Sequence, residues 1–202
     1  MSLVKDLSRR QVLYAAGAAL SLPLTSMVSV GRAAAAAAGR PLPLKIGVAS
    51  YSLRKFPQDK AIAALKDLNV GYVTIKDVHL ARTDTPEQIR AGAQRFRDAG
   101  ITIMGGGTLT WKTPDEAAMR KDFEYAKAAG MPLVVCSPAP DTLDVLEKMV
   151  KAYDIKAAIH NHGTEDPWWP APSDVLKRLD GRDPRLGVCM DIGHAVRAGA
   201  DI

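Results

Sequence analysis

Two histidines lie one residue apart in the stretch AAIHNHGTED, residues 157–166, which follows an apolar run. Asp191 and His194 follow a second apolar run, in the stretch GVCMDIGH. Side chains two positions apart on a strand point the same way, so His160 and His162 are expected to share a face. Neutral imidazole and carboxylate bind divalent metals, among them Mn, Zn, Co, Mg and Fe. We therefore predict His160 and Asp191 as metal ligands, whereas His162 and His194 either orient such ligands or contact substrate.

Taken singly, a histidine at a strand end is more often a hydrogen-bonded structural residue than a metal ligand. This chain has only four histidines, and three of them fall near two strand ends beside an aspartate. That clustering favours a functional site over three separate structural roles.

The elements that must position these residues alternate along the chain from residue 44. Apolar or β-branched runs predict strands at 44–52, 71–80, 101–107, 132–139, 155–162 and 185–194. Amphipathic runs predict helices at 57–69, 85–100, 113–130, 141–154 and 173–181. Because no hairpin signal separates the runs, the strands should be parallel and covered by helices. The sequence thus predicts an α/β fold, either an open doubly wound sheet or a (β/α)₈ TIM barrel.

Two common α/β sites lack their sequence motifs. No G-x-G-x-x-G turn follows an early strand, because Gly105 to Gly107 end the third predicted strand instead. No G-x-S-x-G elbow is present for a hydrolase nucleophile. The polar groups instead follow the strands at their carboxyl ends, where barrels build their active sites.

Further polar residues follow the first two predicted strands. Asp77 and His79 are expected to share a face of the second strand and to contact substrate hydroxyl groups, whereas Lys76 would face the other way. A structural or solvent-exposed role is an equal alternative for each. Tyr51, at the end of the first strand, is a weaker candidate for substrate binding.

Two tryptophans follow the fifth predicted strand in the proline-rich stretch DPWWPAPSD. If exposed, Trp168 and Trp169 would stack on a sugar ring and bind substrate. Packing over the helix layer is the commoner use of a tryptophan and is the alternative.

The stretches AIHNHGTED and GVCMDIGHAVRAGAD resemble the xylose isomerase-like TIM-barrel family, which contains sugar phosphate isomerases and epimerases. The resemblance covers residues 44–202 and includes SYSLRKF, IKDVHL and FEYAKAAG. It implies a metal-dependent enzyme that moves a proton at the carbon beside the carbonyl of a small carbohydrate. By position, it implies that Asp191 is a metal ligand and that His194 contacts the substrate.

The chain departs from the family at His160, where the resemblance implies a glutamate that is both metal ligand and acid/base. An imidazole has an ordinary pKa of about 6.5, against about 4.3 for glutamate. As a metal ligand it is less free to act as the base, so His162, His194 and Glu165 are the candidate catalytic residues. An isomerase or epimerase is therefore our first hypothesis. A keto-sugar or cyclitol lyase or dehydratase, and a sugar-binding protein or inactive fragment without turnover, are the alternatives.

The predicted barrel holds about six of the eight strand-helix units that a (β/α)₈ barrel needs. The resemblance implies that a further metal-binding histidine and glutamate belong to the two strands that are not seen. We therefore expect residues 41–202 to be part of a longer barrel.

Residues 1–38 predict a signal peptide, with a charged start, an apolar middle at 12–30 and an alanine-rich exit. Ser8, Arg9 and Arg10 resemble the twin-arginine motif, which predicts export by the twin-arginine translocase to the periplasm. Retention of the apolar stretch as a membrane anchor is the alternative.

The composition is that of a globular protein, with 47% hydrophobic and 24% charged residues. The net charge falls from +5 to +2 without residues 1–38, which carry four basic and one acidic side chain. No cluster of lysine and arginine remains that would predict nucleic-acid binding. Cys136 and Cys189 lie 53 residues apart, without zinc or redox spacing, and are expected to be unpaired.

Overall fold

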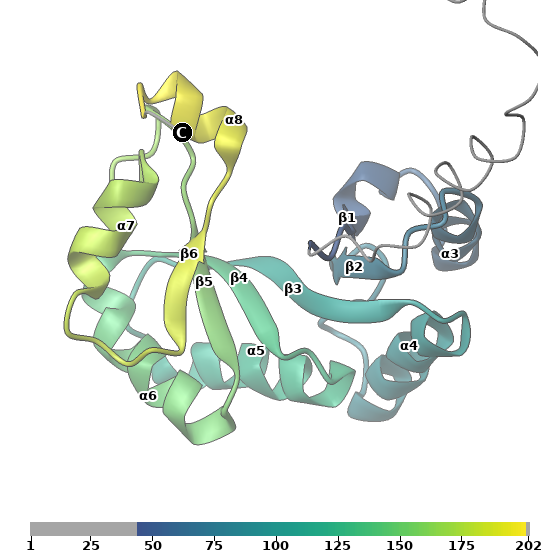
Figure 1. Ribbon diagram of the computed structural model, residues 1–202. Helices are drawn as coiled ribbons and strands as arrows, with labels where there is room; N and C mark the ends of the chain where they lie inside the picture. The colour runs from purple at the N-terminus through teal and green to yellow at the C-terminus, as the bar shows by residue number, and fades with distance from the viewer. Residues whose placement is uncertain (1–43, 201–202) are drawn as a thin grey trace, which may run out of the picture. The chain divides into compact units, whose positions relative to one another are not determined.

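The computed structural model describes residues 44–200, so the predicted signal peptide lies outside the described residues. Six parallel strands form one sheet in the order β1-β2-β3-β4-β5-β6 (Figure 1). A doubly wound sheet reverses its strand order at a switch point, whereas here the spatial order equals the chain order. The doubly wound alternative is therefore excluded, and the predicted partial (β/α)₈ barrel is confirmed.

The strands are β1 (Val48–Ala49), β2 (Tyr72–Ile75), β3 (Thr102–Trp111), β4 (Leu133–Pro138), β5 (Lys156–His160) and β6 (Leu186–Cys189). The helices are η1 (Ser50–Leu53), α3 (Gln58–Asp67), α4 (Pro86–Asp98), α5 (Glu116–Ala129), η2 (Pro140–Thr142), α6 (Leu143–Tyr153), α7 (Pro172–Leu179) and α8 (Ile192–Arg197). Figure 1 shows α5 and α6 along the outer face of the curved sheet and α8 beyond the carboxyl end of β6.

Helix boundaries follow local sequence signals. Thr85 and Gln88 form a reciprocal capping box at the start of α4. The first turn of α5 is capped by the carboxylate of Asp115, so the helix begins within the predicted range 113–130 and not at its first residue. Gly130 ends α5 in the left-handed conformation, with φ of 64°.

Every strand except β3 is shorter than predicted, which moves candidate site residues, and because β5 ends at His160, His162 follows the strand. The ladder of β1 covers only two residues before the chain turns into η1. Because β2 ends at Ile75, Asp77 and His79 lie in a turn, and the prediction that they share a strand face is wrong. Because β6 ends at Cys189, His194 belongs to α8.

Strand β3 is longer than predicted and runs through the glycine triplet. A Cβ atom added at Gly105 would lie 2.6 Å from the carbonyl oxygen of Leu133. The triplet therefore allows the backbone of β4 to approach closely.

The hydrophobic core lies between the sheet and the helices. Its largest fully buried side chains include Phe96, Phe123, Met119, Leu146 and Met149. Burying each such side chain stabilises the fold by about 1.5–3 kcal/mol.

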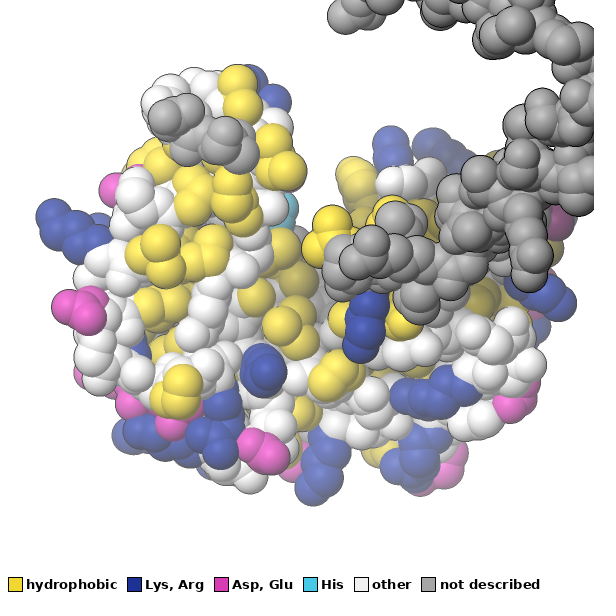
Figure 2. Space-filling view, in the orientation of Figure 1, with side chains coloured by type: hydrophobic (Ala, Val, Ile, Leu, Met, Phe, Trp, Pro, Cys, Tyr) yellow, Lys and Arg dark blue, Asp and Glu magenta, His cyan; other side chains and the backbone are white. Residues whose placement is uncertain are grey.

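Apolar side chains also remain exposed beside β6. They are Leu176, Met190, Ile192 and Val196, each at least 46% exposed. Figure 2 shows hydrophobic side chains, in yellow, gathered over β6, α7 and α8.

The cysteines and the helices of the described residues have the following properties. Cys136 is buried and Cys189 half-buried, and both are free, as predicted. Within residues 44–200, no helix combines the length and apolar character that a membrane span requires.

Candidate functional site

Three histidine rings form a cluster where β5 and β6 end. The ring centroids lie 4.4 Å apart for His160 and His162, 5.9 Å for His160 and His194, and 5.5 Å for His162 and His194. Asp191 joins them, with Oδ2 at 3.5 Å from Nε2 of His160. The structure thus brings together the four residues that follow these two apolar runs in the sequence.

Asp191 uses its two carboxylate oxygens differently. Oδ1 accepts a hydrogen bond of 2.8 Å from the backbone N–H of His194 and caps α8, while Oδ2 is the oxygen nearest His160. This N–H lowers the pKa of Asp191 below its ordinary value of 3.8, and the nearby imidazoles act in the same direction. The carboxylate is therefore ionised at neutral pH, as cation binding requires.

His160 lies in an environment that favours a neutral ring. Burial lowers the pKa of His160 below its ordinary value of 6.5, and neighbouring His162 lowers it further, against the opposing effect of Asp191. Its Nδ1 atom is buried without a hydrogen-bond partner in the described structure. A neutral imidazole is the form that binds a metal ion.

Asn161 ties the end of β5 to the end of β6. Its buried side chain donates from Nδ2 to the carbonyl oxygen of Asp191 at 3.1 Å, and its Oδ1 accepts from the Asp191 N–H at 2.8 Å. These two hydrogen bonds continue the connection between the strands past Cys189 and hold the main chain of Asp191. Asn161 was not predicted as a functional residue from the sequence, although its position between two histidines could have indicated a role.

Asp166 organises the loop after β5. Its Oδ1 accepts from the backbone N–H groups of Trp168 and Trp169 at 2.8 and 2.9 Å. Its Oδ2 lies 3.4 Å from Nδ1 of His162, too long for a good hydrogen bond, and this ring nitrogen has no hydrogen-bond partner among the described residues. Asp166 was missed in the sequence, although an aspartate that bonds to backbone two and three residues later is a known turn pattern.

The two tryptophans differ in burial. Trp169 is 0% exposed and donates from Nε1 to the carbonyl oxygen of Pro138 at 2.6 Å. The prediction that Trp169 stacks on a sugar is therefore wrong, because core packing takes up its whole ring. Trp168 is half-buried on the wall of a cavity, so substrate binding by Trp168 stays a prediction.

A cavity of about 740 Å³ opens beside the histidines. Its lining includes His162, Glu165, Trp168 and His194, and across from the β5 loop Lys76, Thr108 and Ser137. Figure 2 shows a hollow between the two sides of the molecule with a histidine, in cyan, on its wall. The cavity is large enough for a monosaccharide and combines an aromatic wall with hydroxyl groups.

Lys76 faces this cavity, so the prediction that it faces away is wrong. The chain turns after Ile75, and the N–H of Lys76 donates to the buried hydroxyl of Ser50, a residue distant in the sequence, at 2.8 Å. Its ammonium group lies 5.5 Å from the centre of the Tyr51 ring.

His79 is a structural residue. It is 4% exposed, its Nε2 donates to the carbonyl oxygen of Phe56 at 3.1 Å, and its own carbonyl oxygen accepts from Gln58 at 2.7 Å. The prediction that His79 binds substrate is therefore wrong. Tyr51 and Asp77 are exposed and line a separate cavity of about 360 Å³, so substrate binding by these two residues stays a prediction.

The described residues contain part of a possible metal site. His160 and Asp191 face each other in the protonation states that metal ligands need. Within residues 44–200, no group of three or more His, Cys, Asp or Glu side chains is arranged to hold a metal ion. Zinc takes four ligands and magnesium six, so these two donors would need further ligands.

The strand order and the position of the cavity define a class: a partial (β/α)₈ barrel with its polar site at the carboxyl ends of the strands. No protein-family model matches the sequence, and no curated protein matches it either.

Solved structures are nevertheless similar to the chain. An uncharacterized protein from Parabacteroides distasonis ATCC 8503 is 26% identical, with a TM-score of 0.66, over 78% of this chain and 67% of that chain. A provisionally named xylose isomerase from Rhodospirillum rubrum ATCC 11170 is 18% identical, with a TM-score of 0.60, over 75% of this chain and 67% of that chain. An L-ribulose 3-epimerase is 15% identical, with a TM-score of 0.59, over 77% of this chain and 63% of that chain. These similarities support the barrel fold, and the chain spans about two thirds of the length of each structure.

Proposed function

We propose that this chain carries part of the active site of a metal-dependent sugar isomerase or epimerase. The reaction would move a proton at the carbon beside a sugar carbonyl. The main support is the cluster of three imidazoles and one carboxylate where β5 and β6 end, beside a cavity of sugar size. The names of two similar structures, a provisionally named xylose isomerase and an L-ribulose 3-epimerase, point to the same chemistry and to a small carbohydrate substrate.

His160 and Asp191 would supply two ligands of a divalent metal, with Mn, Zn, Co, Mg and Fe as the candidates. When bound, the metal would polarise the carbonyl and stabilise negative charge on oxygen. The other ligands would come from outside the described residues. Asn161 would keep the carboxylate of Asp191 directed to the site, because it holds the main chain of that residue.

The proton transfer would use groups that line the same cavity. His162 and Glu165 are the candidates for the base, and His194 is positioned to contact a substrate oxygen. The hydroxyl groups of Thr108 and Ser137 suit the hydroxyl groups of a sugar.

A keto-sugar lyase or dehydratase is the second candidate. The specific observation in its favour is the imidazole of His160 at the end of β5, where the family resemblance implies a glutamate. In this reaction the same enolate would expel a leaving group from the next carbon. A sugar-binding protein would hold the ligand without exchanging its proton.

The test follows sugar protons in D₂O by NMR, with Mn²⁺ and either L-ribulose or D-xylose. Deuterium beside the carbonyl without loss of water supports the isomerase or epimerase, and loss of water supports the lyase. Asp191→Asn should abolish both Mn²⁺ binding and exchange, while an asparagine still caps α8. Lys156→Gln, on an exposed residue at the opposite end of β5, should keep both. A wild-type protein that carries the complete barrel and neither binds Mn²⁺ nor exchanges the proton would overturn the proposal.

We also propose export to the periplasm by the twin-arginine translocase, supported by Ser8, Arg9 and Arg10. In a bacterial host, replacing both arginines by lysine should shift the protein from the periplasmic to the cytoplasmic fraction. An unchanged distribution would contradict export by this route.

A further inference from the structure

We infer that Arg197 is a positioning residue that keeps the proton of neutral His194 on Nε2, so that His194 donates a hydrogen bond to a substrate oxygen and does not act as the base. This inference rests on the proposed function for its substrate, but the assignment of the proton rests on contacts within the chain.

The first step is the contact between the two side chains. Nη2 of Arg197 lies 2.7 Å from Nδ1 of His194. A guanidinium group has only donors, so Nδ1 must be the acceptor. A neutral imidazole has one proton, which must then lie on Nε2.

The second step is the rigidity of the pair. Residues three positions apart on a helix are neighbours, so α8 holds Arg197 beside His194. Asp191 fixes the helix start through its hydrogen bond to the His194 N–H, and Asn161 fixes Asp191 in turn. The ring also packs against Gly163, where φ is +87° and an added Cβ atom would lie 3.1 Å from Nδ1. The ring is therefore held from more than one side.

The third observation is that His194 borders a cavity. His194 lines the cavity of about 740 Å³. With Nδ1 bonded to Arg197, Nε2–H is the only polar group of the ring that is left for a ligand. An N–H donor stabilises charge that develops on a carbonyl or enediolate oxygen, and it cannot accept a proton from carbon. Proton abstraction is thereby left to His162 or Glu165.

His162 provides an internal contrast. A carboxylate oxygen of Asp166 lies 3.4 Å from its Nδ1, and an ionised carboxylate only accepts. His194 has a donor at the same ring position. The two histidines that line the cavity thus have opposite neighbours, as expected if they have opposite roles.

The test is ¹⁵N NMR of histidine-labelled protein at a pH of about 8, where an ordinary imidazole is neutral. In the wild type, His194 should show a protonated Nε2 and an unprotonated Nδ1. Arg197→Met should give a mixture of tautomers, and Arg197→Lys should restore the wild-type pattern, because an ammonium group is also only a donor. Arg90→Met is the matched control, because Arg90 is an exposed arginine that pairs with Glu87 three residues earlier on α4.

Kinetics supply the second readout. Arg197→Met should slow proton exchange on the sugar by about tenfold without changing the affinity for Mn²⁺. A proton on Nδ1 in the wild type, or a tautomer that Arg197→Met leaves unchanged, would overturn the inference. The expected tautomers in a chain that exchanges no sugar proton would support the role of Arg197 and overturn the proposed function, so the two failures can be told apart.

Discussion

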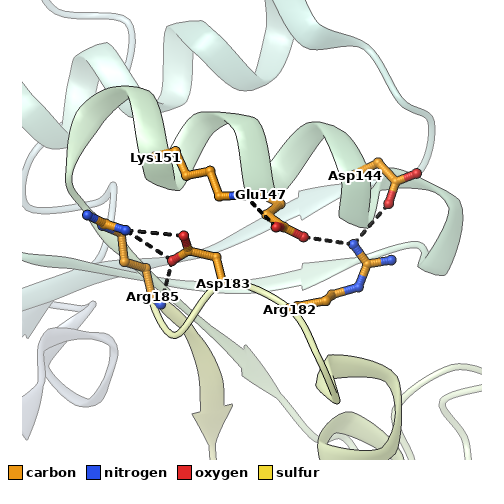
Figure 3. A network of polar contacts seen from close by, with 6 residues as sticks. All are labelled: Asp144, Glu147, Lys151, Arg182, Asp183 and Arg185. Atoms are coloured by element: carbon orange, nitrogen blue, oxygen red, sulfur yellow. Dashed lines mark hydrogen bonds and ion pairs between the residues drawn. The ribbon is translucent and has the colours of Figure 1, made fainter.

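The polar groups near the two ends of the neighbouring strands β5 and β6 differ in whether they have partners. A network of ion pairs joins residues 182–185, which precede β6, to α6 (Figure 3). Its members are Asp144, Glu147, Lys151, Arg182, Asp183 and Arg185. Arg182 contacts both Asp144 and Glu147, at 2.9 and 3.1 Å, and Lys151 contacts Glu147 at 2.6 Å. Each charge in this network has an opposite charge beside it.

At the carboxyl ends of the same strands, polar atoms lack partners. Nδ1 of His160 and Nδ1 of His162 are buried without hydrogen bonds in the described structure, and Nδ1 of His79, in the turn after β2, is the third such atom. A buried polar group without a partner is unfavourable by about 1–3 kcal/mol. The two that belong to the histidine cluster lie at the carboxyl ends of the strands, where barrels carry their chemistry. The comparison therefore separates a stabilising end from a functional end.

The sharpest test of this separation is His160→Gln. We expect Mn²⁺-dependent proton exchange to fall by about 100-fold or more, because a metal ligand and its electrostatic effect are lost. The thermal unfolding temperature should change little, because Nδ1 of His160 has no hydrogen bond to lose. Exchange rates and thermal unfolding of the same samples check both statements. A large loss of stability with full activity per folded molecule would break the comparison.

Asn161→Ala should affect both properties, because Asn161 stabilises the main chain of a functional residue. We expect the free energy of unfolding to fall by about 2 kcal/mol, since two buried hydrogen bonds are lost. The affinity for Mn²⁺ should fall as well, because Asp191 is no longer held. Urea unfolding and a Mn²⁺ titration measure the two effects.

Thr142→Val is the matched control for Asn161→Ala. The buried Thr142 hydroxyl donates one hydrogen bond to the carbonyl oxygen of Ala139, away from the histidines. This variant should lower the free energy of unfolding by about 1 kcal/mol and leave the affinity for Mn²⁺ unchanged. Equal effects of both variants on Mn²⁺ binding would remove the special role of Asn161.

Arg182→Met tests the stabilising end. Its side chain is only 26% exposed and contacts two carboxylates, so we expect a loss of about 1 kcal/mol in the free energy of unfolding, smaller at high salt. Proton exchange should keep its wild-type rate. Arg90→Met, which breaks an exposed pair on α4, should change the free energy of unfolding by less than about 0.5 kcal/mol. A slower exchange rate in Arg182→Met would show that the two ends are coupled.

The fold could be predicted from the sequence because its signals are local. Hydrophobic period, helix caps and the absence of hairpin turns all lie within single segments, and they were sufficient to predict six parallel strands. The choice of a barrel over a doubly wound sheet rested on the family resemblance. The strand ends were not predictable in the same way. The end of β2 depends on a hydrogen bond between Lys76 and Ser50, which lie 26 positions apart. The positions of His79 and Lys76 were therefore predicted wrongly.

The candidate site could be predicted from the sequence only in part. His160, His162, Asp191 and His194 could be identified because each follows an apolar run, and parallel strands bring their carboxyl ends to one edge. Asn161 could not, since its role depends on main-chain atoms of a distant residue. The burial of Trp169 also depends on a contact across the fold, with Pro138.

The smallest expected effect is a difference in the pH dependence of stability. Burial lowers the pKa of His160 below 6.5, so below that pH the unfolded chain binds a proton that the folded chain does not. The stability that His160 contributes is therefore complete above pH 6.5 and is lost as the pH falls toward its folded-state pKa. Asp191, whose pKa is lowered from 3.8, keeps its contribution until the pH falls below that value.

The ion-pair network adds little to the change of the unfolding free energy with pH between pH 6.5 and about 5. Lys151 lowers the pKa of Glu147 below 4.5, and the N–H of Arg185 lowers the pKa of Asp183 below 3.8, so both carboxylates titrate at lower pH. In urea unfolding across this pH range, the unfolding free energy of His160→Gln should fall less than that of the wild type. The unfolding free energy of Arg182→Met should fall by the same amount as that of the wild type. If His160→Gln ran parallel and Arg182→Met did not, the titrating groups would lie at the stabilising end, and the comparison would have to be reversed.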